Sequence, residues 1–217
     1  MKDCHTHERF HIKSLDELKG LIAELDLRNI PVVDSGVDVL TTPVEVAGRT
    51  LPHRFTVHPM EGFDADPQGS PGPLAFRRYR RYAEGGAALI WCEATAVRHE
   101  ARSNPGQFYI HAGNVATFAK LVRDTKAAGR AAMGFEPVMI LQLTHSGRYS
   151  KPSGVPEPII AHRSPILDPK HNLPEDYPVV TDDYLDGLQD TFVEAANLAK
   201  QAGFDGVDIK SCHRYLF

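Results

Sequence analysis

The stretch GFDGVDIKSCHRYLF, residues 203–217, closes the 217-residue chain and decides how the rest is interpreted. Gly203 is expected to end a helix, and residues 206–209 form a short apolar segment typical of a strand. Lys210, His213 and Tyr215 follow at once. If the strand ends near Ile209, these three side chains lie at its carboxyl end, where parallel sheets gather ligands.

Three further apolar runs precede this stretch, and polar residues follow each of them. They cover residues 55–57, 87–91 and 137–141. Helical patterns lie between the runs, at about 74–84, 115–128 and 182–202, with Gly85, Gly129 and Gly203 as the expected helix ends. Strands that are apolar throughout, rather than alternating, indicate a parallel sheet covered by helices. The sequence therefore predicts an α/β fold.

Residues 1–50 are interpreted as an N-terminal extension, and residues 51–217 as the main domain. Ser14 and Glu17 have the spacing of a helix start, and residues 31–33 and 37–40 look extended. Residues 43–52 predict a hairpin that turns at Gly48 and covers the bottom of a barrel. His5-Thr6-His7 has metal-site spacing, but without an apolar strand around it a mobile terminal segment is favoured.

Composition excludes several classes of protein. The chain has 24 basic and 28 acidic residues, so its net charge of −4 argues against nucleic-acid binding. Its three cysteines form no CxxC pair, which argues against a disulfide framework or a cysteine-rich metal site. No apolar run approaches the roughly 18 residues of a membrane span, and no signal-peptide pattern opens the chain. We therefore expect a cytoplasmic protein.

Polar side chains follow each expected strand. They are Glu61, Glu93, Gln142 with His145, and Lys210 with His213. Each has an ordinary structural explanation when taken alone, such as a buried histidine that stabilises a loop. Their placement at four successive strand ends indicates a site, in a barrel or in an open sheet. No GxGxxG or GxxxxGK[ST] motif follows any strand, which lowers the case for a dinucleotide-binding or phosphate loop.

Four motifs in the same order resemble the old yellow enzyme family, the FMN-dependent NADH:flavin oxidoreductases close to 2,4-dienoyl-CoA reductases. The motifs are Pro59-Met60, residues 81–97 with Glu93-Ala94-Thr95, residues 142–148 (QLTHSGR) and residues 202–209 (AGFDGVDI). The resemblance spans about residues 43–217. It implies a (β/α)8 TIM barrel, of which this chain supplies about the first four β/α units.

The resemblance also implies roles for individual residues. Pro59, Met60 and Glu61 would line the isoalloxazine ring of FMN, Ala94 would approach its edge, and Gln142 would hydrogen-bond its pyrimidine side. Substrate would be held by His213 and Lys210, with Tyr215 as the proton donor. NAD(P)H would reduce FMN, and hydride would then pass to an activated alkene or an enoyl or dienoyl substrate.

Two residues depart from the family pattern. Lys210 stands where the family has a histidine, and Glu61 stands where it commonly has Thr or Cys. A carboxylate beside the flavin disfavours the electron-rich reduced state, whereas an ammonium group stabilises it. We therefore expect Lys210 and Glu61 to compensate each other, with Lys210 also binding the cofactor.

Four strands are expected where the family barrel has eight. This implies a truncated or frame-disrupted product, or part of a longer protein, without the phosphate-binding strands or the iron–sulfur cysteines of some relatives. Such a chain would bind FMN weakly, and its open sheet edges would favour homo-oligomers. The alternative is a truncated, catalytically incompetent half-barrel that acts only as an assembly or interaction module. A metal-dependent hydrolase, based on His5 and His7, is the least favoured interpretation.

Overall fold

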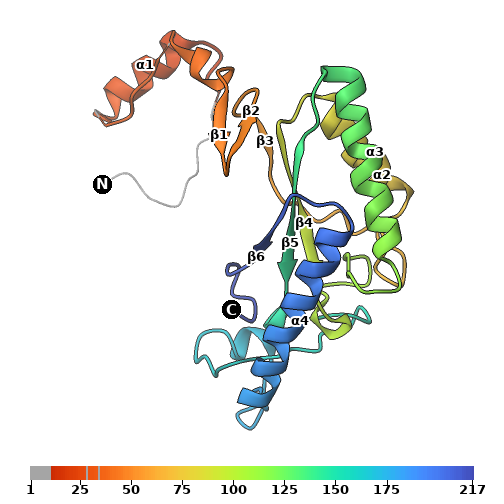
Figure 1. Ribbon diagram of the computed structural model, residues 1–217. Helices are drawn as coiled ribbons and strands as arrows, with labels where there is room; N and C mark the ends of the chain where they lie inside the picture. Colours follow the sequence, from red (N-terminus) through yellow and green to blue (C-terminus); the bar gives the residue numbers. More distant parts are fainter. Residues whose placement is uncertain (1–10, 28, 34) are drawn as a thin grey trace.

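The central feature of the computed structural model, which describes residues 11–217 except 28 and 34, is a four-stranded parallel sheet (Figure 1). Its strands lie in the order β3 (Thr56–Val57), β4 (Leu89–Ala96), β5 (Val138–Thr144) and β6 (Gly206–Ile209). The helices α2 (Pro73–Glu84), α3 (Val115–Met133) and α4 (Asp182–Gln201) alternate with the strands along the chain. This is the α/β architecture that the apolar runs predict.

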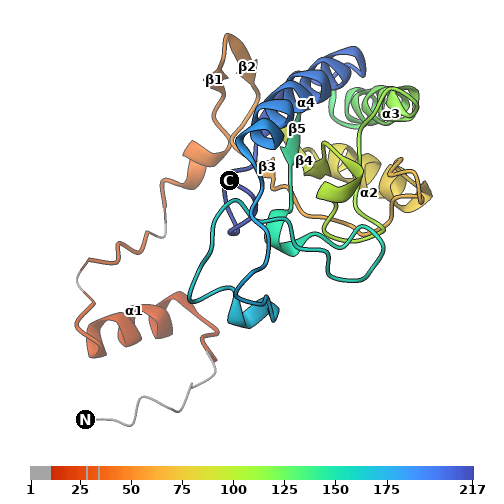
Figure 2. The ribbon, with the colours of Figure 1, turned by 90° about the horizontal axis from the view of Figure 1, so that it is seen from below.

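The three helices cover one face of the sheet only (Figures 1 and 2). Side chains that alternate along β4 and β5 show this division. Ile90 and Met139 point to the helices and are fully buried, with an exposed fraction of 0%. Trp91 and Ile140, one residue further along, line a hollow of about 600 Å³ on the other face. The helix-free face corresponds to the interior of a barrel.

A two-stranded hairpin lies at the amino ends of the sheet strands (Figure 1). It consists of β1 (Val44–Val46) and β2 (Arg49–Leu51), and the turn places Gly48 at a φ of 76°. Arg49 forms an ion pair of 2.6 Å with Asp205, which directly precedes β6. The hairpin predicted at residues 43–52 is therefore confirmed, including its turn.

Two helix starts also follow the prediction. Ser14 caps α1 (Leu15–Glu24) by accepting a hydrogen bond of 3.2 Å from the Glu17 N–H. Thr181 caps α4 in the same way through Tyr184. Both contacts satisfy N–H groups that the first turn of a helix leaves without partners.

Other boundaries were predicted wrongly. The helix α3 passes through Gly129 and ends at Met133, before Gly134 with a φ of 79°. Gly129 is an interior helix position where a side chain would lie 2.7 Å from Cδ of the Pro137 ring, so close packing and not a helix end requires glycine there. Residues 37–40 form a 3₁₀ turn, and residues 31–33 have no regular structure.

Strands β4 and β5 run three to five residues further than the apolar runs indicate. Glu93, Ala94 and Thr95 lie within β4, and Gln142 lies within β5. The pairing of the two strands shifts register between Cys92 and Thr95. Such a bulge turns side chains at the end of a strand and is common beside functional sites.

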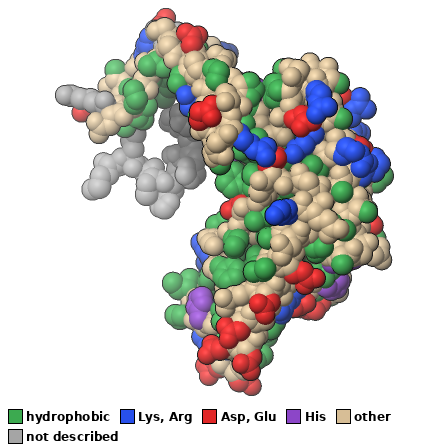
Figure 3. All heavy atoms as spheres, in the orientation of Figure 1, with side chains coloured by type: hydrophobic (Ala, Val, Ile, Leu, Met, Phe, Trp, Pro, Cys, Tyr) green, Lys and Arg blue, Asp and Glu red, His purple; other side chains and the backbone are tan. Residues whose placement is uncertain are grey.

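Charged side chains are unevenly distributed over the visible surface. In Figure 3, acidic groups gather over the amino end of α4, at the foot of the view, and Lys and Arg side chains over α2 and α3. Asp182 and Asp183 lie in the first turn of α4, where the helix dipole favours negative charge. In the described part of the chain, no helix has the length and apolarity needed to cross a bilayer. His5 and His7 lie outside the described residues.

Candidate active site

A hollow of about 640 Å³ lies at the carboxyl ends of the sheet strands. It brings together six of the eight residues that the sequence assigns to the site, from two segments far apart in the chain. The first segment follows β3 and supplies Pro59, Met60 and Glu61, and the second follows β6 and supplies Lys210, His213 and Tyr215. The other lining residues are Phe63, Ser103, Asn104, Tyr149 and Lys151.

The segment after β6 turns back sharply and is held at both ends. The N–H of Lys210 donates to the carbonyl of Leu143, and the N–H of Leu216 donates to the carbonyl of His145. Between these anchors, His213 and Arg214 adopt φ angles of 61° and 58°. Left-handed geometry costs a non-glycine residue roughly 1–3 kcal/mol and persists where the surroundings enforce it. The strained turn keeps the second segment at the hollow.

Lys210 is buried, and its ammonium group lies over an aromatic ring. Its exposed fraction is 6%, and Nζ lies 4.4 Å from the centroid of the Tyr215 ring. Among the residues that the structure describes, no carboxylate lies within ion-pair distance of it. Lys210 and Glu61 therefore form no direct ion pair in this structure, and their expected compensation across the site remains a prediction.

Glu61 is instead held by side chains of the loop after β4. Ser103 Oγ donates to Glu61 Oε2 at 2.8 Å, and Gln107 Nε2 donates to Oε1 at 3.2 Å. Asn104 Nδ2 donates at 3.4 Å. Burial is the main influence on the Glu61 carboxyl and raises its pKa above the ordinary value, against the opposing effects of the Ser103 and Asn104 hydrogen bonds and of the Lys210 charge. Lys210 thus acts on Glu61 through its field and not through contact.

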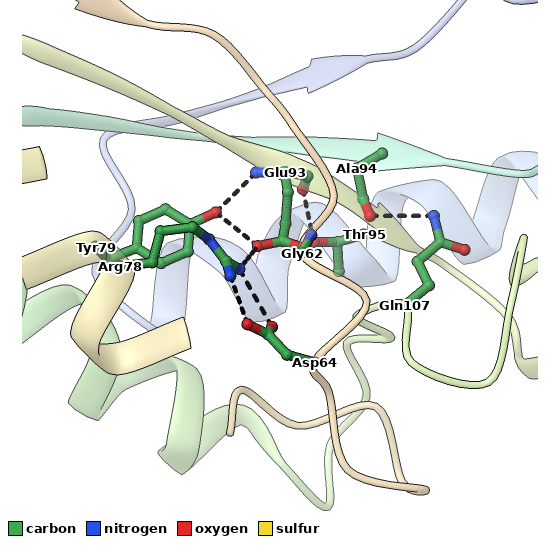
Figure 4. Close-up of polar contacts among 8 residues, drawn as sticks. All are labelled: Gly62, Asp64, Arg78, Tyr79, Glu93, Ala94, Thr95 and Gln107. Carbon is green, nitrogen blue, oxygen red and sulfur yellow. Dashed lines mark hydrogen bonds and ion pairs between the residues drawn. The ribbon is translucent and has the colours of Figure 1, made fainter. Parts of the chain in front are cut away.

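Glu93 belongs to a buried network that fixes the loop carrying Glu61 (Figure 4). Its carboxylate accepts the Gly62 N–H at 2.7 Å and the Tyr79 hydroxyl at 3.1 Å, and it pairs with Arg78. Arg78 also pairs with Asp64 on the same loop. Burial raises the pKa of Glu93, and the Gly62 and Arg78 contacts oppose that rise. This residue therefore positions the loop and does not line the hollow.

Two residues assigned to the flavin by resemblance are outside the lining of the hollow. The Ala94 side chain is 1% exposed, and its carbonyl accepts a hydrogen bond of 3.1 Å from Gln107 Nε2 (Figure 4). Gln142 is 7% exposed, and its Nε2 donates to Asp208 on β6 at 2.7 Å. Their roles toward a cofactor remain predictions.

Two ionisable groups near the turn have strongly shifted pKa values. Burial, and then the charge of Arg98, lowers the pKa of His145 to about 4, so this ring is neutral at pH 7. Its Nδ1 accepts from the Gly147 N–H, and its Nε2 contacts the Tyr184 hydroxyl at 2.8 Å. Burial, and then the negative charge of Glu61, raises the pKa of Tyr215 to about 12. His145 therefore fits the ordinary structural explanation, and Tyr215 holds its proton at neutral pH.

Sequence reasoning missed five lining residues. Phe63 lies in the loop after β3, Ser103 and Asn104 lie in the polar, glycine- and proline-containing loop after β4, and Tyr149 and Lys151 lie in the loop after β5. A general signal was present, because loops at the carboxyl ends of parallel strands carry functional groups. The individual residues could not be identified, because the contact between Ser103 and Glu61 joins positions 42 residues apart.

Comparison with known proteins gives consistent matches. The family described as NADH:flavin oxidoreductase / NADH oxidase matches residues 39–217. An NADPH dehydrogenase of Bacillus pumilus is 33% identical over 182 residues, which cover 82% of this chain and 49% of that protein.

Solved structures of flavin oxidoreductases of this kind match the chain as well. Morphinone reductase matches with a TM-score of 0.65 and 26% identity, over 82% of this chain and 49% of its own. An old yellow enzyme homologue from Zymomonas mobilis matches with a TM-score of 0.65 and 25% identity, over 82% and 49% of the two chains. The chain therefore spans about half the length of the curated relatives it matches, and its sheet is part of a TIM barrel.

Proposed function

The chain belongs to the NADH:flavin oxidoreductase / NADH oxidase family, and from that premise we propose that its hollow takes part in FMN-dependent reduction of an activated alkene. One observation carries the proposal. Residues 59–61 and residues 210–215, separated by some 150 positions, meet around one hollow at the carboxyl ends of the strands. Barrels of this architecture place their chemistry at that end.

The lining fits the ring system of FMN. Pro59 and Met60 offer an apolar wall to a flat aromatic group, and Met60 is 61% exposed. Lys210 and His213 place polar groups on the opposite segment. When bound, FMN supplies a two-electron carrier that takes hydride from NAD(P)H and passes it to the β-carbon of the alkene. Glu61, Ala94 and Gln142 are proposed as further contacts.

Tyr215 is proposed as the proton donor. Because its pKa is raised to about 12, its hydroxyl stays protonated at neutral pH and can donate to the α-carbon. The tyrosinate left behind lies beside the Lys210 ammonium, which is 4.4 Å from the ring centroid and stabilises the new charge. Lys210 and His213 also hold the electron-withdrawing oxygen of the substrate.

The replacement Tyr215→Phe tests this assignment on the protein loaded with FMN. We expect NAD(P)H to bleach the flavin absorbance at an unchanged rate, because that step needs no proton from Tyr215. Reduction of an α,β-unsaturated ketone should fall by about 10²–10⁴-fold, as for loss of a general acid.

Tyr149→Phe is the matched control, because this tyrosine lines the same hollow and its ring centroid lies 5.7 Å from that of Tyr215. Its ketone reduction should stay close to wild type. Equal rates of ketone reduction in Tyr215→Phe and Tyr149→Phe would contradict the role of Tyr215 as proton donor. Failure of the wild-type protein to bind FMN would overturn the proposed function itself.

A further inference from the structure

We propose that the hollow recognises a carboxylate anion through Lys210, so that the substrate class is an α,β-unsaturated carboxylate. The alkene part of this statement rests on the proposed function. The carboxylate part rests on the surroundings of Lys210 alone.

Lys210 is a buried cation without a counter-ion in the described structure. Removing an ammonium group from water is costly unless an opposite charge compensates it. The half-buried Lys126 shows the usual solution, since its Nζ lies 2.8 Å from Asp205. Lys210 is more deeply buried, at 6% exposure. Within residues 11–217, leaving out 28 and 34, its ammonium group has no hydrogen-bond or ion-pair partner and lies 4.4 Å from the centroid of the Tyr215 ring. A ring face compensates an ammonium group less well than a carboxylate does.

Glu61 lines the same hollow but does not act as the counter-ion of Lys210. Both of its oxygens already accept hydrogen bonds from Ser103, Asn104 and Gln107. Burial raises the pKa of the Glu61 carboxyl, because desolvation opposes its charged form. The place of a counter-ion beside Lys210 is therefore left to a ligand.

The charges around the hollow favour a ligand with a single negative charge. Lys151 and Lys210 both line it, and His213 adds a further donor. Glu61 is in the same lining and would repel a phosphate dianion more strongly than a carboxylate. An ammonium and an imidazole can each donate to one carboxylate, which gives two charge-assisted hydrogen bonds because the acceptor is ionised.

The chemistry of such a substrate suits these residues. A carboxylate withdraws electrons weakly from an adjacent double bond because it is already negative. Contact with Lys210 offsets that charge as it grows in the transition state. The β-carbon gains a hydride that originates from NAD(P)H, and the α-carbon gains the Tyr215 proton. The C=C bond becomes a single bond, NAD(P)+ is released, and water returns a proton to Tyr215.

Equilibrium dialysis of the flavin-free chain tests the inference with trans-cinnamate and its uncharged methyl ester. Wild type should bind the acid at least about 10-fold more tightly than the ester, the size of one charged hydrogen bond. Lys210→Met should reduce this preference to nearly one, and Lys210→Arg should keep most of it. Lys200→Met is the matched control, because Lys200 is exposed in the last turn of α4 and does not line the hollow, and it should retain the preference.

An equal affinity for acid and ester in wild type would overturn the inference. So would a preference that survives in Lys210→Met, with folding of each variant checked by circular dichroism. The assay needs no flavin, so the two proposals fail separately. If the protein prefers the acid over the ester but does not bind FMN, only the proposed function is contradicted. If it binds FMN but does not prefer the acid, only this inference is contradicted.

Discussion

Two buried ionisable groups, His145 and Glu93, connect single residues to the stability of the site. His145 joins the end of β5 to α4 through the Tyr184 hydroxyl, and it accepts the N–H of Gly147. Glu93 joins β4 to the loop that carries Glu61. Both belong to the scaffold that holds the lining side chains in place, so their effects can be measured without a ligand.

His145 should make the protein lose stability in mild acid. Its pKa is lowered from 6.5 to about 4 in the folded state, so the unfolded chain takes up a proton first as pH falls. The neutral form is fully compatible with folding above about pH 6.5, and stability is lost as pH falls from there toward 4. Between pH 7 and pH 4.5 wild type should lose about 2 kcal/mol more than His145→Gln.

Urea unfolding at several pH values measures this difference. The comparison between the two proteins removes the contributions of carboxyl groups that titrate in the same range. Parallel stability curves for wild type and His145→Gln would contradict the prediction.

Arg78 and Glu93 should show strong energetic coupling. The Glu93 side chain is completely buried. Arg78→Met therefore leaves the Glu93 carboxylate without a compensating charge and should cost about 3–5 kcal/mol of unfolding free energy. Adding Glu93→Gln removes that charge, so the double variant should cost less than the sum of the two single changes. Denaturant unfolding of all four proteins gives the coupling, and additive costs would show that the pair is not a unit.

At the scale of elements, apolar runs predict where the strands lie but not where they end. The polar Glu93 and Gln142 were expected to follow β4 and β5, yet both lie within them. A polar residue can stay in a buried strand when a distant partner satisfies it. Arg78 does so for Glu93, and Asp208, 66 residues away, does so for Gln142. Such partners are not visible in a local pattern.

The loops of the site show the same limit. The sequence placed residues 59–61 and 210–215 at one edge of the sheet, and the structure brings them together. The sequence gives no indication that Ser103 and Asn104 hold Glu61, and Lys210 was the only residue expected to balance its charge. The resemblance to a known family supplied the expected roles of these residues. Their hydrogen-bond partners depend on tertiary contacts that the local sequence does not show.

Gly147 should be the glycine on which the turn after β6 depends. Its φ is 57°, and a side chain there would lie 2.5 Å from the Leu216 nitrogen. Gly147→Ala must therefore displace the segment that carries Tyr215. Gly134→Ala is the matched control, because Gly134 has a φ of 79° but open space around it, and its cost should be about 1 kcal/mol.

We expect Gly147→Ala to cost clearly more than Gly134→Ala in thermal unfolding, and to weaken cinnamate binding as well. The control should leave cinnamate binding unchanged. Similar effects of the two changes on both measurements would show that the close approach to Leu216 is unimportant.

At the scale of the whole molecule, three helices cover one face of a four-stranded parallel sheet, and the chain spans about half the length of its curated relatives (Figure 2). The outer strands β3 and β6 each pair on one side only within the described residues. Self-association through these edges remains a prediction. The fold class was predictable because four apolar strands alternate with helices, whereas the activity depends on how the two lining segments meet.

The most direct test of the central claim is a titration of FMN fluorescence with the purified chain. The claim predicts a saturable change for wild type and for Met133→Asp, an exposed methionine on α3 away from the hollow. Met60→Asp places a charge in the apolar wall of the hollow and should weaken binding by about 10-fold or more. No saturable change with wild type, or equal binding by the two variants, would contradict the claim that this hollow binds the flavin.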